Sequence, residues 1–145
     1  RLPGLEQLFP IRVVVGATAQ SLVGTKLAST ANDVPVWCLG DVDGDGTISE
    51  IACAQDDDGQ VDLASATALL AERGIGRLLI EGGAKIARSF LNADLVDEVV
   101  LFTAPHELGA GGVAAPLELV NSANFIVSDP ILLGVDEMKV YDRVR

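Results

Sequence analysis

The sequence has few of the features that mark membrane, secreted or nucleic-acid-binding proteins. Its apolar runs, such as residues 13–15 and 78–80, are far too short to cross a membrane. It has no basic leader followed by an apolar stretch, so nothing argues for secretion. It also has no basic stripe, and its net charge of −11 argues against nucleic-acid binding.

Cysteine is also scarce in this chain. Cys38 and Cys53 lie in strand-like apolar stretches, and they have neither the spacing of a disulfide framework nor that of a metal site. They are therefore predicted to be reduced core residues of a cytoplasmic protein, and no metal ligands are predicted.

What the chain does have is enough apolar residues for a core. Its 145 residues are 49% apolar, with a mean hydropathy of +0.38, which predicts a single folded domain. Eight of its 21 acidic residues lie between Asp41 and Asp62, where there is no Lys or Arg. The rest of the chain carries a net charge of only −3, so it can still bind an anionic ligand. The first residue is Arg1 rather than Met, which indicates a processed chain or part of a longer protein.

The apolar pattern alternates between strands and helices. Asp62 is a predicted helix cap, Gly74 a predicted helix stop, and Gly134 begins a predicted turn. Strands are predicted over residues 11–15, 34–39, 51–55, 77–81, 96–103, 125–133 and 137–144, and helices over residues 63–73 and 84–92. This order predicts an α/β fold with a mixed sheet, mostly parallel with an antiparallel C-terminal hairpin, flanked by helices.

The sharpest candidate site is the segment Leu-Leu-Ile-Glu-Gly-Gly-Ala-Lys over residues 78–85. A predicted buried strand ends at Glu81, two glycines follow, and a helix begins, which is where α/β sheets place ligands. The free amides of that helix favour a phosphate, and Lys85 and Arg88 add positive charge. Glu81 is expected to be partly buried. The alternative is a plain strand-to-helix turn that needs glycine for its backbone angles.

A second candidate runs from Asp41 to Ser49 and fits the opening of a calcium loop. It has acids at positions 1, 3 and 5, glycine at position 6 and an apolar residue at position 8. Position 12, which should be a bidentate Glu, is Ala52, and strands rather than helices are predicted on both sides. The alternative to a calcium site is an exposed acidic turn.

Several further segments, in order along the chain, resemble one known family. They are Arg12-Val13-Val14-Val15, Gln60-Val61-Asp62-Leu63, Glu72-Arg73-Gly74-Ile75, Leu79-Ile80-Glu81-Gly82-Gly83-Ala84, Phe90-Leu91, Leu95-Val96-Asp97-Glu98 and Ala104-Pro105. Together they resemble the reductase domain of the bifunctional riboflavin-biosynthesis deaminase/reductase.

This resemblance implies a dihydrofolate-reductase-like fold, NADPH as cofactor and a cytoplasmic homodimer. It implies the reduction of the ribosyl group of 5-amino-6-ribosylaminopyrimidinedione 5′-phosphate to ribityl, with hydride going to the open-chain imine carbon. Glu81 and Arg1 would bind the substrate, and no catalytic residue is assigned. The implied cofactor-binding residues are Gly82, Gly83, Ala84, Lys85, Ile86, Ala87, Arg88 and Ser89.

The chain departs from the family at three points. The family's N-terminal portion, which includes its first strand, does not precede Arg1. The chain is therefore expected to be a single reductase domain over residues 1–145 that lacks this portion. Alone, it is expected to have little or no activity. Gly16 and Ala17 follow the strand where the family usually has Asp, which puts one cofactor contact in doubt. The deaminase motifs His-x-Glu and Pro-Cys-x-x-Cys do not occur.

Three alternatives remain open at this point. The chain could be another dihydrofolate-reductase-like reductase of a pterin or pyrimidine. It could be a calcium-binding module built on the segment from Asp41 to Ser49, or an unrelated α/β domain whose Gly-Gly turn is only structural.

Overall fold

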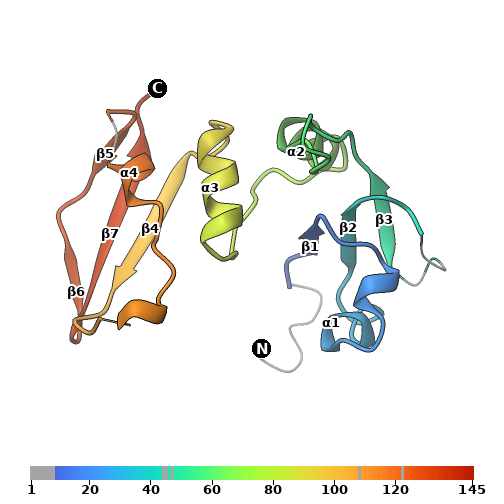
Figure 1. Cartoon of the computed structure of the whole chain (residues 1–145), viewed down its shortest axis with the longest axis horizontal. Coiled ribbons are helices and arrows are strands. Elements are labelled where there is room, and N and C mark those ends of the chain that lie inside the picture. Colours follow the sequence, from blue (N-terminus) through green and yellow to red (C-terminus); the bar gives the residue numbers. More distant parts are fainter. Residues whose placement is uncertain (1–8, 44–45, 47, 108, 122) are drawn as a thin grey trace. The chain divides into compact units, whose positions relative to one another are not determined.

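The structure is a computed structural model that describes residues 9–43, 46, 48–107, 109–121 and 123–145 (Figure 1). The chain folds into two compact units, Arg1–Gly76 and Arg77–Arg145. In the described part of the chain, no helix is long and apolar enough to span a membrane.

The first unit is built on a parallel three-stranded sheet. Its elements are β1 (Arg12–Val15), the 3-10 helix η2 (Gln20–Leu22), α1 (Lys26–Ser29), β2 (Val36–Gly40), β3 (Ser49–Ala52) and α2 (Leu63–Glu72). The strand order is β1-β2-β3, with Val14 opposite Cys38 and Leu39 opposite Ile51. The carboxyl ends of all three strands therefore lie at one edge of the sheet.

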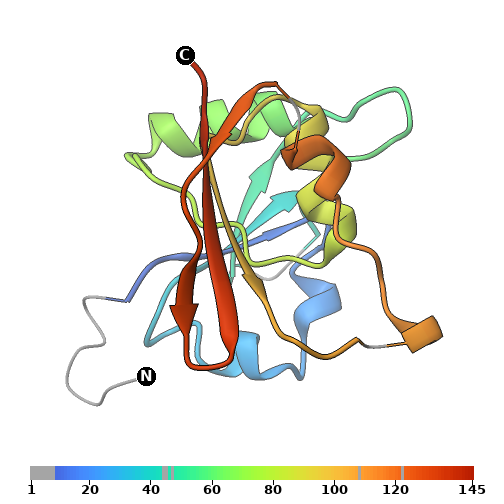
Figure 2. The same cartoon turned by 90° about the vertical axis from the view of Figure 1, so that its left-hand side faces the viewer.

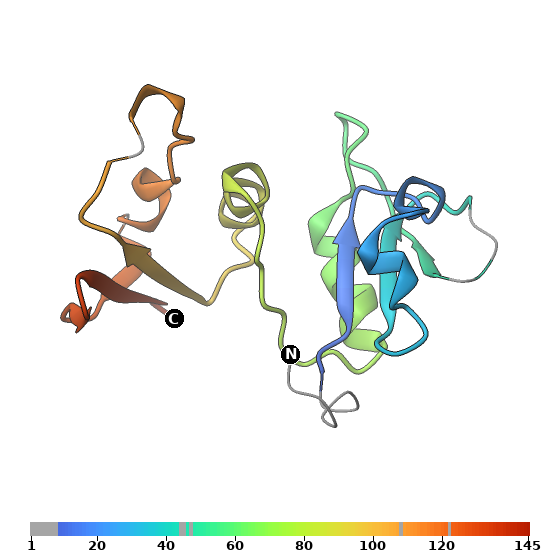
Figure 3. The same ribbon diagram turned by 90° about the horizontal axis from the view of Figure 1, so that it is seen from below.

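Side chains alternate between the two faces of this sheet because β2 has the two-residue period of a strand. Val36 and Cys38 face a core formed with η2 and α1, whereas Leu39 packs with Ile51 and the buried face of α2. Figure 3 shows the sheet between α2 and α1. Cys38 is fully buried, and burial raises the pKa of its thiol, as expected for an unreactive core cysteine.

The predicted boundaries of α2 are confirmed. The Asp62 carboxylate caps the helix by accepting a hydrogen bond from the Ser65 amide at 2.7 Å. At the other end, Gly74 has a φ of +86°, and the Ile75 amide donates to the Leu70 carbonyl. This left-handed glycine ends the helix as a Schellman motif does.

The second unit is built on an antiparallel sheet. Its elements are α3 (Ala84–Asn92), β4 (Glu98–Thr103), the 3-10 helix η3 (Gly109–Gly111), α4 (Leu117–Val120), β5 (Phe125–Val127), β6 (Ile131–Leu133) and β7 (Asp136–Arg143). β7 pairs with β4 on one side and with β5 and β6 on the other (Figure 2). Among the described residues of this unit, the buried ones are Phe90 of α3, Pro116, Val120 of α4 and Tyr141 of β7.

The predicted strand over residues 125–133 is interrupted in the structure. Pro130, which has no backbone N–H, separates β5 from β6. Ser128 bridges the break, because its amide donates to the Val140 carbonyl and its hydroxyl accepts from the Val140 amide at 3.1 Å. The hairpin turn into β7 is where it was predicted, and Gly134 has the positive φ of +70° that such a turn needs.

Arg143 ties the end of α3 to the sheet. Its guanidinium pairs with Asp94, its Nε donates to the Val96 carbonyl at 2.6 Å, and it stacks 4.9 Å from the centre of the Phe125 ring. Asp94 has a φ of +61° and follows the C-cap Ala93 of α3, so an aspartate here occupies the place that glycine usually takes.

The prediction of a strand over residues 77–81 is wrong, because no strand forms there in this structure. In the described part of the chain, residues 76–83 are neither helical nor paired with a strand. The apolar run of Leu78, Leu79 and Ile80 is not buried on both faces as predicted, and Leu79 is 78% exposed. A strand needs a hydrogen-bonded neighbour, and apolar side chains alone do not supply one.

The predicted fold class is nevertheless confirmed, since parallel and antiparallel strands are flanked by helices.

Candidate functional site

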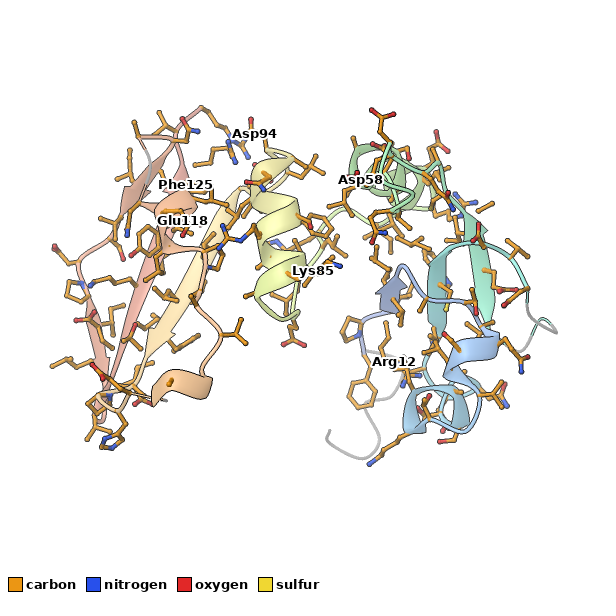
Figure 4. All side chains as sticks on the ribbon, viewed as in Figure 1. Arg12, Asp58, Lys85, Asp94, Glu118 and Phe125 are labelled. Atoms are coloured by element: carbon orange, nitrogen blue, oxygen red, sulfur yellow. The ribbon has the colours of Figure 1, made fainter. Side chains whose placement is uncertain are left out.

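The amino terminus of α3 has the properties of an anion-binding site. Its cap is Gly83, which has no side chain, and no acidic residue lies in the first turn. Within the described residues, the amides of Ala84, Lys85 and Ile86 have no hydrogen-bond acceptor. Lys85 is exposed in the same turn (Figure 4). The unpaired amides and the helix dipole favour a negative charge at this end, and Lys85 adds to that attraction.

The two glycines before α3 have different roles. An ideal Cβ at Gly82 would lie 1.7 Å from Cγ2 of Ile86, so Gly82 allows Ile86 to pack against the backbone. An ideal Cβ at Gly83 would meet nothing within 4 Å, and its φ of −68° suits any residue. Packing within the chain therefore explains Gly82, whereas the space beside Gly83 is open to a ligand.

The structure brings together the predicted residues from Glu81 to Ser89 as one continuous turn and helix. Glu81 is exposed, so the expectation that it is partly buried is wrong: it lies in an unpaired segment rather than at the end of a buried strand. Ile86 and Ala87 are half-buried, which leaves mainly their backbone for a cofactor. The Ser89 hydroxyl donates to the Lys85 carbonyl at 3.1 Å. Arg1 lies outside the described residues.

Arg88 has a partner that the sequence did not reveal. Its guanidinium forms an ion pair and hydrogen bond with Glu118 of α4, 30 residues further along the chain. The Arg88 hydrogen bond lowers the pKa of the Glu118 carboxyl. No local pattern in the sequence indicates this pair, since it depends on how α4 packs against α3.

Gly16, where the resemblance leads us to expect aspartate, lies at the carboxyl end of β1. Its φ is +71°, and its amide donates to the Leu39 carbonyl at 3.0 Å. Glycine adopts this backbone conformation without strain, whereas a residue with a Cβ does so at a cost. The departure at this position therefore suits the local backbone.

The acidic segment from Asp41 to Ser49 connects two parallel strands, β2 and β3, as predicted from its flanks. Positions 44, 45 and 47 of this segment lie outside the described residues. Glu50 belongs to β3, and its carboxylate accepts hydrogen bonds from the amides of Asp43 at 3.0 Å and Ala19 at 3.3 Å. Ala52, at the position of the bidentate ligand, is also in β3. In the described part of the chain, no three His, Cys, Asp or Glu side chains are grouped as metal ligands would be.

We therefore expect calcium to bind this segment no more tightly than the millimolar range, because the bidentate carboxylate of a calcium loop is missing at Ala52. Isothermal titration calorimetry with CaCl₂ measures the affinity, and the Ala52→Glu variant is the matched comparison. A micromolar or tighter calcium affinity in the wild-type chain would favour a calcium-binding module instead.

These features define the class of protein. The parallel sheet of the first unit and the antiparallel sheet of the second, which are flanked by helices, give this chain a mixed α/β fold. The sequence profile of the RibD C-terminal domain matches residues 6–140, and the chain therefore belongs to that family. No match is found among curated proteins.

Solved structures support the same fold. The chain is similar to the riboflavin biosynthesis reductase Rib7 of Saccharomyces cerevisiae, with 18% identity and a TM-score of 0.68 over 94% of this chain and 69% of that one. It is similar to a deaminase/reductase of Thermotoga maritima, with 18% identity and a TM-score of 0.63 over 93% of this chain and 38% of that one. It is also similar to RibD of Acinetobacter baumannii, with 19% identity and a TM-score of 0.60 over 93% of this chain and 37% of that one.

Proposed function

We propose that this domain is the NADPH-dependent reductase of riboflavin biosynthesis, which converts the ribosyl group of 5-amino-6-ribosylaminopyrimidinedione 5′-phosphate to ribityl. Membership of the RibD C-terminal domain family supports an oxidoreductase acting on a pyrimidine. The observation that carries the assignment of the site is the uncapped amino terminus of α3, with open space at Gly83 and a cation at Lys85.

The residues of this site suit a phosphorylated dinucleotide. The free amides of Ala84, Lys85 and Ile86 would hold a phosphate, and Gly83 would let it approach the backbone closely. When bound, NADPH would supply a hydride for the imine carbon of the opened sugar, and the imine nitrogen would take up a proton from water. The protein's part is then to hold the phosphate and to orient the pyrimidine.

Glu81 is our candidate for orienting the pyrimidine. Its exposed carboxylate directly precedes the glycines, and it can accept hydrogen bonds from donor groups of the ring. Hydrogen bonds to a charged acceptor contribute about 1.5–3 kcal/mol each. We assign Glu81 to substrate binding and not to proton transfer.

The Glu81→Gln variant is therefore expected to raise the substrate KM about tenfold, the loss of roughly one such hydrogen bond, while the NADPH affinity stays unchanged. Steady-state kinetics and NADPH titration by fluorescence measure the two effects in a full reductase domain. Glu98→Gln, which removes another exposed acid, serves as the control. An unchanged KM would rule out the role of Glu81.

Two measurements test the assignment as a whole. NADPH binding, followed by its fluorescence, distinguishes a reductase from a domain whose Gly-Gly turn is only structural. Comparing turnover of the ribosylaminopyrimidine with turnover of a panel of pterins distinguishes the proposed reaction from that of another dihydrofolate-reductase-like reductase.

We also propose that the protein is cytoplasmic, forms a homodimer and consists of a single domain, as the resemblance implies. Sedimentation velocity measures the mass of the assembly.

A further inference from the structure

The ion pair between Arg88 and Glu118 lies one helical turn from the end of α3 where we place the cofactor phosphate. We propose that Glu118 competes with this phosphate for Arg88 and so limits the affinity of the site for its cofactor. This inference rests on the proposed function. It adds Glu118 of α4, which lies outside the segment from Glu81 to Ser89, as a residue that limits the cofactor affinity.

The first step concerns the reach of Arg88. Arg88 follows Ala84 by four residues, so the two lie on the same face of α3. Long side chains on a helix lean toward its amino terminus. The Arg88 guanidinium can therefore extend over the first turn, toward the free amides. In the structure the guanidinium instead pairs with Glu118 of helix α4, the residue labelled in Figure 4.

The second step concerns how firmly Glu118 holds Arg88. The hydrogen bond from Arg88 lowers the pKa of the Glu118 carboxyl, so at neutral pH Glu118 is ionised and attracts the guanidinium. The Arg88 side chain is 44% exposed and that of Glu118 is 58% exposed. Water screens such a pair, which therefore opens easily.

The third step compares the two acceptors. A phosphate offers as many charged acceptor oxygens as a carboxylate or more, and the guanidinium fork can bind it through two parallel hydrogen bonds. The three free amides of α3 would bind a phosphate at the same place, whereas the Glu118 carboxylate has the hydrogen bonds of Arg88 and of its own backbone amide. A bound phosphate is therefore expected to displace Glu118, but breaking the ion pair lowers the net affinity.

The test measures the NADPH dissociation constant of the wild-type chain and of E118Q, R88Q and the double variant. We expect E118Q to bind NADPH about 1.5- to fivefold more tightly, the range for an exposed ion pair. In the R88Q background, E118Q should have no effect. D129N removes an exposed acid from the loop between β5 and β6 as the charge control, and it should leave the affinity unchanged. The NADPH dissociation constant of E118S, a second variant without the carboxylate, is measured in the same way. Far-UV circular dichroism checks the fold of each variant.

The outcomes separate this inference from the proposed function. If the wild-type chain does not bind NADPH, the proposed function is wrong and this inference with it. If the wild-type chain binds NADPH but E118Q and E118S bind it equally or more weakly, only this inference is wrong. Equal tightening by D129N, or by E118Q in the R88Q background, would overturn it too, because the effect would then be one of overall charge.

Discussion

The Gly83→Val variant is expected to bind NADPH about ten- to a hundredfold more weakly than the wild-type chain while keeping its fold. A Cβ at Gly83 meets no protein atom within 4 Å, and the extended backbone there accepts a β-branched residue. The added isopropyl group would instead occupy the space before the free amides of α3. Losing one hydrogen bond to a charged phosphate costs about 1.5–3 kcal/mol, which corresponds to this loss of affinity.

Fluorescence titration with NADPH measures the effect, and thermal unfolding checks the fold. Gly76→Val is the matched control, because a Cβ at Gly76 also meets nothing within 4 Å and this glycine is not part of the candidate site. Wild-type affinity in a folded Gly83→Val protein would show that no ligand approaches the backbone at this turn.

The neighbouring Gly82→Ala variant is expected to affect stability instead. The new Cβ would overlap with Cγ2 of Ile86 at 1.7 Å and crowd its Cβ at 3.1 Å. Ile86 is β-branched and has one strongly preferred rotamer in a helix, so it cannot turn aside cheaply. Such overpacking costs about 1–3 kcal/mol, and the midpoint of thermal unfolding should fall by roughly 2–10 °C.

The double variant Gly82→Ala/Ile86→Ala tests this cause, because it removes the methyl group that the new Cβ would meet. Its stability is compared with that of Ile86→Ala alone. If Gly82→Ala costs as much in the Ile86→Ala background as in the wild-type chain, the clash with Ile86 is not the reason for glycine at this position.

The sequence alone was sufficient wherever one residue decides the local backbone. Asp62 and Gly74 delimit α2, Gly134 forms the hairpin turn, and α3 spans the predicted residues Ala84–Asn92. Caps and turns depend on groups a few residues apart, so their signals lie within a short stretch of sequence. The candidate site from Glu81 to Lys85 was likewise predicted from a short stretch of sequence.

Tertiary structure decided the features that depend on distant partners. The apolar run at residues 77–81 has the composition of a strand, but strand formation requires backbone hydrogen bonds to another segment. For the same reason the exposure of Glu81 could not be predicted from its apolar neighbours. The different roles of Gly82 and Gly83 depend on where Ile86 packs, and the pairing of Arg88 with Glu118 joins residues 30 positions apart. Composition and spacing carry no information on such contacts, because only the packing of α4 against α3 brings the two charges together.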